Sequence, residues 1–350
     1  MRKQMKLMSV LLVIMLLAMA VPVHAAGLPA QARAAHLQVP SSYTGEAAYE
    51  HVRYLSKEIG PRVASTDAEL EATAYVFDQF EAMGYDPIVQ PFTYVRQGQT
   101  RSSQNIIAVK PGRSDATVVV GAHYDSVNRG EGATDNASGV GVMLEVASVL
   151  KDYPTHANVV FIAFGAEEVG LHGSRYYVNS LSDNEIAQTV AMINMDMVSG
   201  YGDNLYAYSA LNGATWVRDM ALDIGWNQGI EIHSTVGLYY DGATGDWSDH
   251  RYFRDAGIPI VYFEHWNWHF DPTDSWGIEN AERFEEFGDH YHTVNDTLEW
   301  VDKERMADVG RIVAPLVYEL ARTPLPNMNS RGVGKRTQKF NAVGASERIK

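Results

Sequence analysis

The chain has 350 residues, no cysteine and a formal net charge of −15, because 43 acidic residues outnumber 28 basic ones. An acidic balance of this size argues against nucleic acid and anionic membranes as partners. The absence of cysteine excludes structural disulfides and a cysteine nucleophile. A chain of this length can bury a core large enough to fold without disulfides.

The amino-terminal segment has the three parts of a secretory signal peptide. Three basic residues stand among the first six, and an apolar run follows from Leu7 to Val21. Val23 and Ala25 are small residues at the −3 and −1 positions of a cut after Ala25. The apolar run is short for a membrane span, which needs about 20 residues. We therefore expect residues 1–25 to be a signal peptide and the mature protein to be secreted, with no membrane attachment after cleavage.

One catalytic domain is predicted for residues 45–322. Residues 26–44 are weakly patterned and read as a short propeptide or an amino-terminal arm. Helices are expected over residues 45–59 and 67–83, and strands and helices then alternate to the end of the domain. This alternation predicts an α/β fold with a mostly parallel central β-sheet flanked by helices on both faces. Residues 323–350 form a basic tail, which we expect to be disordered.

Two polar clusters stand at the two ends of one strand-to-helix connection. His123-Tyr124-Asp125 directly follows the apolar run Val118–Ala122, and Asp135 to Gly139 precedes a helical pattern over residues 140–150. Both clusters therefore lie beyond the carboxyl end of one strand, where open α/β sheets place their ligands. Imidazole nitrogen and carboxylate oxygen are the usual non-thiol ligands of zinc, so the pattern indicates a metal site.

Three later apolar strands, over residues 158–164, 188–195 and 257–263, are each followed by further potential ligands. The candidate ligands are then His123, Asp135, Glu168, Asp196 and His292. Two histidines and three carboxylates are too many for one tetrahedral zinc. They fit two zinc ions, held about 3.5–4 Å apart, if one carboxylate bridges them.

These residues lie in five motifs that resemble the secreted di-zinc aminopeptidases of metallopeptidase family 28, the bacterial leucyl aminopeptidase type. The motifs are His123-Tyr124-Asp125-Ser126, Gly132 to Gly139, Gly165-Ala166-Glu167-Glu168, Asn194-Met195-Asp196 and Tyr291-His292-Thr293. An upstream Gly60-Pro61-Arg62 also fits, and the resemblance covers about residues 45–320. The five motifs occur in the right order, each after a plausible strand, which makes the resemblance specific.

The resemblance implies a cofactor of two Zn²⁺ per chain and a place for each ligand. Asp135 would bridge both ions. His123 and Asp196 would complete one site, and Glu168 and His292 would complete the other. The implied reaction is the release of amino-terminal residues from peptide substrates with a free N-terminus.

Three more residues are implied to assist the reaction. Asp125 would hydrogen-bond His123 from behind, as carboxylates near metal-binding histidines commonly do. Tyr291 would help to polarise the scissile carbonyl. Glu167 would be the general base. Residue chemistry agrees, since Glu167 adjoins Glu168: one carboxylate can bind metal while the other moves a proton from metal-activated water to the leaving amine.

The aromatic-rich residues 264–289 read as a long loop that walls the pocket for the first side chain of the substrate. Apolar walls favour apolar first residues. His265 and His269 have the i, i+4 spacing of a metal pair, although a structural or pocket role is favoured. Ser248-Asp249-His250 is expected beside the site, and Trp247 stands where some relatives of the family carry an arginine.

Two other classes of protein stay open. One is a glutaminyl cyclase-like or carboxypeptidase-like relative on the same fold. The segment Asn136 to Gly139 and the segment from His292 to Thr297 look like the peptidase form rather than the cyclase form. The other is a catalytically dead binding module. Such modules lose metal ligands or the base, whereas this chain keeps the five candidate ligands and Glu167.

Overall fold

The computed structural model describes residues 44–200, 204–234, 243–266 and 290–322. The predicted signal peptide and basic tail lie outside the described residues, as do most of the predicted arm and residues 267–289. The signal peptide, the tail and the domain boundaries therefore stay predictions. Within the described part of the chain, every helix is too short or too polar to cross a membrane.

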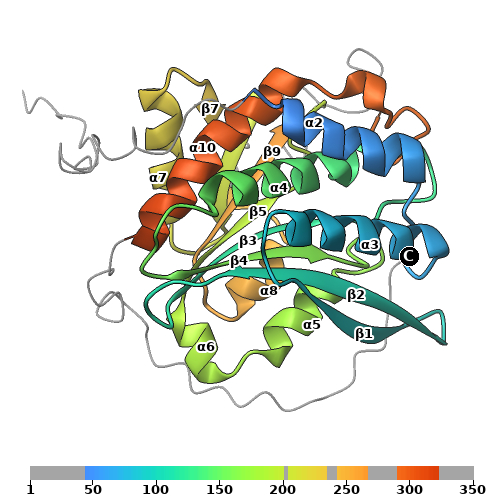
Figure 1. Cartoon of the computed structure of the whole chain (residues 1–350), viewed down its shortest axis with the longest axis horizontal. Helices are drawn as coiled ribbons and strands as arrows, with labels where there is room; N and C mark the ends of the chain where they lie inside the picture. Colours follow the sequence, from blue (N-terminus) through green and yellow to red (C-terminus); the bar gives the residue numbers. More distant parts are fainter. Residues whose placement is uncertain (1–43, 201–203, 235–242, 267–289, 323–350) are drawn as a thin grey trace, which may run out of the picture.

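A nine-stranded sheet runs through the described structure (Figure 1). Its strands are β1 (Ile88–Arg96), β2 (Gln99–Lys110), β3 (Thr117–His123), β4 (Asn158–Phe164), β5 (Thr189–Met195), β6 (Asn204–Ala210), β7 (Ile232–His233), β8 (Ala243–Thr244) and β9 (Ile260–Trp266). They are ordered β1-β2-β4-β3-β5-β9-β6-β7, and β8 pairs with β6. The four central strands β4, β3, β5 and β9 are parallel, while β2 and β6 join them antiparallel. This mostly parallel sheet confirms the predicted fold class.

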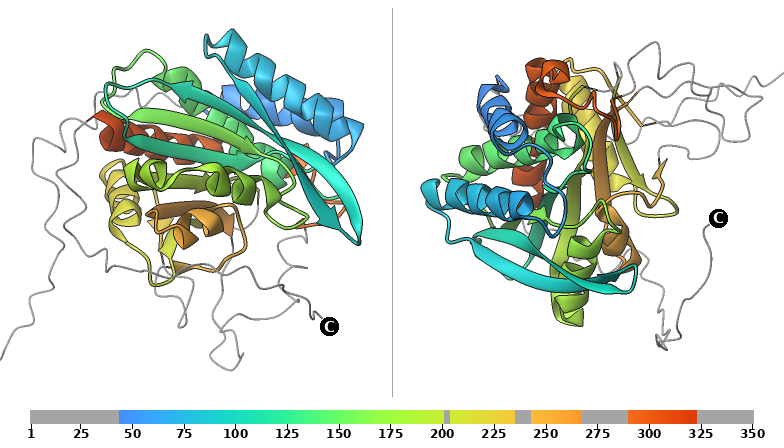
Figure 2. Two further views of the ribbon diagram at one scale, coloured as in Figure 1. Left: turned by 90° about the horizontal axis from the view of Figure 1, so that it is seen from below. Right: turned by 90° about the vertical axis from the view of Figure 1, so that its right-hand side faces the viewer.

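Helices cover both faces of the sheet, also as predicted (Figures 1 and 2). One face carries α2 (Glu46–Arg53), its π-helical continuation η2 (Tyr54–Ile59), α3 (Asp67–Ala82), α4 (Ser138–Leu150), α7 (Trp216–Asn227) and α10 (Lys303–Arg322). The other face carries α5 (His172–Ser180), α6 (Asp183–Gln188) and α8 (His250–Asp255). The short turns η3 (Ala133–Ala137) and η4 (Leu298–Trp300) complete the described elements near the site.

The central strands alternate between two hydrophobic cores, because successive side chains of a strand point to opposite faces. Val118 and Val120 pack in the core beneath α4 and α10, whereas Val119 packs in the core beneath α5 and α8. His123 continues the series of Val119, four positions on, at the last residue of β3. The same alternation puts Asp196, the residue after β5, on the same face as Met192, which belongs to that second core. The second face thus leads directly to the functional side chains.

Two elements differ from the prediction. The edge of the sheet is an antiparallel hairpin, β1 and β2, rather than another parallel unit. At the other side, β9 does not stop at Phe263, where the apolar run ends, but continues to Trp266. The reason is backbone pairing, since β6 lies antiparallel to β9 with Asn204 opposite Trp266. Glu264 and Trp266 are therefore strand residues and not part of a loop.

Candidate active site

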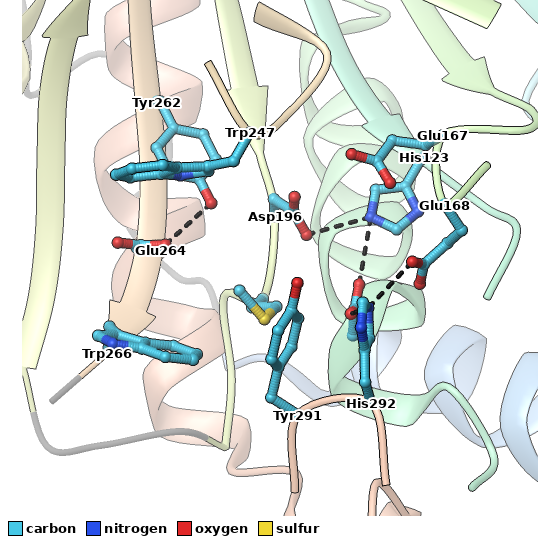
Figure 3. A pocket seen from close by; sticks show the side chains of 12 residues that line it. His123, Glu167, Glu168, Asp196, Trp247, Tyr262, Glu264, Trp266, Tyr291 and His292 are labelled. Carbon is cyan, nitrogen blue, oxygen red and sulfur yellow. Dashed lines mark hydrogen bonds and ion pairs between the residues drawn. The ribbon is translucent and has the colours of Figure 1, made fainter. Parts of the chain in front are cut away.

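A pocket of about 260 Å³ opens at the carboxyl ends of β3, β5 and β9. Its lining residues are His123, Asp135, Glu167, Glu168, Asp196, Met197, Trp247, Tyr262, Glu264, Trp266, Tyr291 and His292. Figure 3 shows two opposed walls with Tyr291 between them. The polar wall consists of His123, Asp135, Glu167, Glu168, Asp196 and His292. The aromatic wall consists of Trp247, Tyr262, Glu264 and Trp266. The pocket gathers every predicted ligand, together with Glu167 and Tyr291.

His123 faces two carboxylates through one ring nitrogen. Its Nε2 lies 3.2 Å from Oδ1 of Asp135 and 3.2 Å from Oδ1 of Asp196. Its Nδ1 lies 3.1 Å from the main-chain oxygen of Asp125, to which it donates, because a carbonyl can only accept. In the neutral ring the lone pair is therefore on Nε2, directed at the two carboxylates. This is the tautomer that a metal-binding histidine uses.

His292 repeats this arrangement on the other oxygen of the same aspartate. Its Nε2 lies 3.2 Å from Oδ2 of Asp135 and 3.0 Å from Oε2 of Glu168. Asp135 thus faces one histidine with each carboxylate oxygen. Each of these histidines also meets a second carboxylate, Asp196 or Glu168. The five predicted ligands form two sets of three that share Asp135.

Asp125 lies behind His123, as predicted, but its carboxylate has a different partner. The carboxylate is 3.7 Å from the His123 Nδ1, which is too long for a hydrogen bond. Its two oxygens instead accept the main-chain N–H groups of Glu167, at 3.0 Å, and Glu168, at 3.2 Å. Asp125 therefore holds the loop that carries both glutamates, while its main-chain oxygen orients the His123 ring.

The polar wall is crowded with buried acids. Burial and the neighbouring charge of Asp135 raise the pKa of Glu168 to about 7. Burial, with further carboxylates nearby, also raises the pKa of Glu167 well above its ordinary value. Although burial alone would lower it, hydrogen bonds to Asp135 and Glu168 raise the pKa of His292 to about 10. Burial is the largest cause for the two glutamates, whereas the carboxylates of Asp135 and Glu168 raise the pKa of His292. Several acids are thus buried together, and a cation would neutralise their negative charge.

Arg62 braces the loop that precedes the site. Its guanidinium is fully buried and donates to five main-chain oxygens, those of Leu55, Gly60, Tyr124, Glu131 and Gly132, at 2.6–3.0 Å. At Gly132, φ is +62° and a Cβ would lie 2.7 Å from the Arg62 Nη2, so only glycine fits there. The predicted motif Gly60-Pro61-Arg62 thus supplies a structural cation.

Two further residues fix Asp135 itself, and the sequence analysis, which named the segments that contain them, assigned neither residue a role in the site. The Asp296 carboxylate accepts the main-chain N–H of Thr134 at 2.7 Å and that of Asp135 at 3.2 Å. The Asn136 side chain donates to the main-chain oxygen of Met195 at 2.9 Å and accepts from the N–H of Met197 at 3.2 Å. These bonds join the Asp135 segment to the segment that carries Asp196.

Alternate residues of β9 supply most of the aromatic wall. Tyr262, Glu264 and Trp266 are two residues apart and share one face of the strand. Trp266 meets the ring of Tyr291 edge to face at 5.7 Å, and Tyr291 stacks on His292 at 3.8 Å. Tyr291 therefore stands where the two walls meet, in position to contact a bound substrate.

The remaining predicted histidines lie away from the polar wall. His265 is buried on the opposite face of β9, where its Nδ1 donates to the main-chain oxygen of Val198. Its predicted structural role fits this position, and His269 lies outside the described residues. Asp249 is buried close enough for its charge to affect Glu167, and Trp247 lines the pocket. His250 is buried, and its Nε2 donates a hydrogen bond to the main-chain oxygen of Gly245.

Comparison with known proteins agrees with this geometry. Residues 105–317 match Peptidase family M28. The aminopeptidase YwaD of Bacillus subtilis is 36% identical over 229 residues, which cover 63% of this chain and 46% of that protein. The chain therefore spans about half the length of this curated relative. The fold is shared with a zinc aminopeptidase of Bacillus subtilis (24% identity, TM-score 0.67, covering 82% and 97% of the two chains). It is also shared with a glutaminyl cyclase of Porphyromonas gingivalis (21% identity, TM-score 0.65, covering 79% and 98%). The chain belongs to peptidase family M28.

Proposed function

We propose that the protein is a secreted di-zinc aminopeptidase that removes single residues from peptides with a free amino terminus. The observation that carries the proposal is the shared carboxylate of Asp135. Each of its oxygens lies 3.2 Å from the Nε2 of a different histidine. A carboxylate flanked in this way by two half-sites is suited to bridging two metal ions.

The donor set fits zinc. His123 and Asp196 would hold one ion with Asp135, and Glu168 and His292 would hold the other. Two observations support a cation at this place. The Glu168 Oε1 is buried and lacks a hydrogen-bond partner among the described residues. The described residues that line the pocket include acids and histidines but no lysine or arginine. Zinc there would act as a Lewis acid and lower the pKa of water toward about 7.

Glu167 is the proposed general base. Its carboxylate is buried in the polar wall. The possible ligand atoms of Glu167, His123 and Asp196 all lie within 4.8 Å of one another, so Glu167 is next to the proposed metal site. It accepts a proton from the attacking water and delivers it to the leaving amine nitrogen. Asp125 supports this role. Its carboxylate accepts the main-chain N–H groups of Glu167 and Glu168 and so fixes the backbone from which the two side chains project. The Tyr291 hydroxyl is assigned to the carbonyl oxygen of the scissile bond.

The size and charge of the pocket support the proposed restriction to amino-terminal residues. A pocket of about 260 Å³ is below the usual range for ligand sites, so it suits one residue rather than a longer segment. The substrate's α-ammonium is attracted by carboxylate oxygens of the polar wall that the zinc ions leave uncoordinated. A blocked amino terminus lacks this charge, so N-acetylated peptides should be poor substrates.

The test combines elemental analysis with three assays on the purified, zinc-saturated protein. We expect two zinc ions per chain, hydrolysis of a leucine chromophore amide, and little hydrolysis of its N-acetyl derivative. A single zinc with cyclisation of amino-terminal glutamine would instead make the chain a cyclase, whose fold it shares. Release of carboxyl-terminal residues would make it a carboxypeptidase. Two zinc ions with no turnover in any assay would make it a binding module.

Secretion is part of the proposal and has a separate test. The sequence predicts cleavage after Ala25, so exported material should begin at or after Ala26. Amino-terminal sequencing or intact mass of the exported protein measures this directly. A mature chain that keeps residues 1–25 would overturn the signal-peptide prediction without affecting the proposed chemistry.

A further inference from the structure

We infer that Glu69 is a positioning residue for the proposed general base, because it fixes the main chain of the residues that precede Glu167. The inference rests on the proposed role of Glu167 and adds a residue that supports it. Glu69 lies in the first turn of α3, outside the lining of the pocket. It therefore acts on the reaction only through the loop of residues 165–168.

The Glu69 carboxylate bonds to two other segments rather than to its own helix. Thr66 caps α3 and accepts the N–H of Glu69 at 3.4 Å. In a capping box the glutamate side chain would return to the N–H of the capping residue. Instead its Oε2 accepts the N–H of Ser65 at 2.6 Å, and its Oε1 accepts the hydroxyl of Ser103 in β2 at 2.5 Å. The side chain is buried, with 1% exposure, so water does not compete with these bonds.

Ser103 and the Glu69 carboxylate both meet the loop that carries Glu167. Gly165 packs so closely on β2 that a Cβ at this position would collide with the Ser103 Oγ. The main-chain N–H of Ala166 stabilises the ionised carboxylate of Glu69 by a further hydrogen bond. Glu69 therefore holds the two residues before Glu167, one directly and the other through Ser103.

Glu69 and Asp125 share the support of this loop. Asp125 accepts the N–H groups of Glu167 and Glu168, so the two carboxylates serve three successive main-chain N–H groups. Ala166 needs such support, because its φ of +54° lies in a region that residues with a side chain rarely adopt. Burial and the charge of Asp125 raise the pKa of Glu69 to about 7. Burying two neighbouring acids costs stability, which favours a role in holding the loop over a role in stabilising the fold.

The experiment measures kcat, KM and zinc content with a leucine chromophore amide on zinc-loaded variants of the full chain. Glu69→Ala should lower kcat about 10- to 100-fold, because a displaced base loses its geometry, while KM stays within about twofold and zinc content is unchanged. Glu69→Gln should restore part of kcat, since its amide can accept from Ser65 and donate to the Ser103 oxygen. Glu71→Ala is the matched control, because it removes the same charge from an exposed side chain of the same helix.

A double-mutant cycle with Glu167→Gln separates positioning from a merely structural role. Once the base is removed, Glu69 has no base to position, so Glu69→Ala should cause no further loss of kcat in that background. A structural defect would cost the same factor in both backgrounds. That result would overturn the inference, and so would a loss of zinc or an effect confined to KM. If Glu69→Ala does not fold, Ser103→Ala removes one of the same bonds and completes the cycle.

Failure of the inference differs from failure of the proposed function. If the wild type cleaves no aminoacyl amide, the proposed function fails and the inference falls with it. If the wild type is active and Glu167→Gln is far less active, but Glu69→Ala matches the wild type, only the assignment of Glu69 fails.

Discussion

The two walls of the pocket are built in different ways. The polar wall draws six residues from distant parts of the chain, between His123 and His292, and buried main-chain hydrogen bonds hold them. The aromatic wall takes three of its four residues from alternate positions of the single strand β9. A substitution in the polar wall breaks hydrogen bonds or ion contacts that several other residues share. A substitution in the aromatic wall changes only the surface that one side chain offers to the substrate. We infer that the first wall carries the chemistry and the second carries the choice of substrate.

The largest effect should come from the residue that joins the two half-sites. In Asp135→Ala both histidines lose their shared carboxylate, so zinc should be lost from both sites and activity abolished. His123→Ala should keep one ion preferentially, because the contact between His292 and Glu168 remains. Elemental analysis under saturating zinc measures the contrast. Equal metal content in the two variants would contradict the bridging role of Asp135.

Within the polar wall, adjacent glutamates should separate catalysis from metal binding. Glu167→Gln keeps the shape of the base but cannot accept a proton, so kcat should fall on the order of 10²–10⁴-fold with zinc content intact. Glu168→Gln should lower zinc content as well. Steady-state kinetics and metal analysis on the same preparations test the pair. Near-normal activity in zinc-loaded Glu167→Gln would remove Glu167 from the mechanism.

A smaller effect is expected where the polar wall is supported from behind. Asp296→Asn replaces one of the oxygens that accept the N–H groups of Thr134 and Asp135. Partners of this kind change metal affinity about 10- to 100-fold. Competition with a chromogenic chelator measures the zinc affinity, and excess zinc should restore most of the activity. An affinity equal to that of the wild type would show that Asp135 needs no such support.

The smallest effect belongs to the aromatic wall. Trp266→Ala should change the preference between leucine and phenylalanine amides by about 1–2 kcal/mol, or roughly five- to thirtyfold. Zinc content should stay at the wild-type value, because Trp266 lies against the ring of Tyr291, which is not a proposed ligand. The ratio of kcat/KM for the two amides measures the change in preference, and metal analysis of the same preparation is the control. A loss of zinc together with the change in preference would mean that the two walls are not independent.

Short-range patterns were sufficient to predict the central strands and most of the polar wall. His123, Glu168 and Asp196 each follow an apolar run, and parallel strands bring their carboxyl ends to one edge of the sheet. The predicted helices over residues 45–59 and 67–83 match α2 with η2 and α3 to within a residue at each end. Hydrophobic period and order along the chain carry this information, because both depend on neighbours in sequence.

Other features were decided only by tertiary structure. Asp125 binds the N–H groups of Glu167 and Glu168 because β3 and β4 lie side by side, and Asp296 reaches Asp135 across more than 150 positions of sequence. Glu264 joins the pocket because pairing with β6 extends β9 beyond its apolar run. The sequence alone does not distinguish an acidic side chain that follows a strand and points into solvent from one that points into a cavity. Which of these occurs depends on the strands and loops that pack around it, and these come from distant parts of the chain.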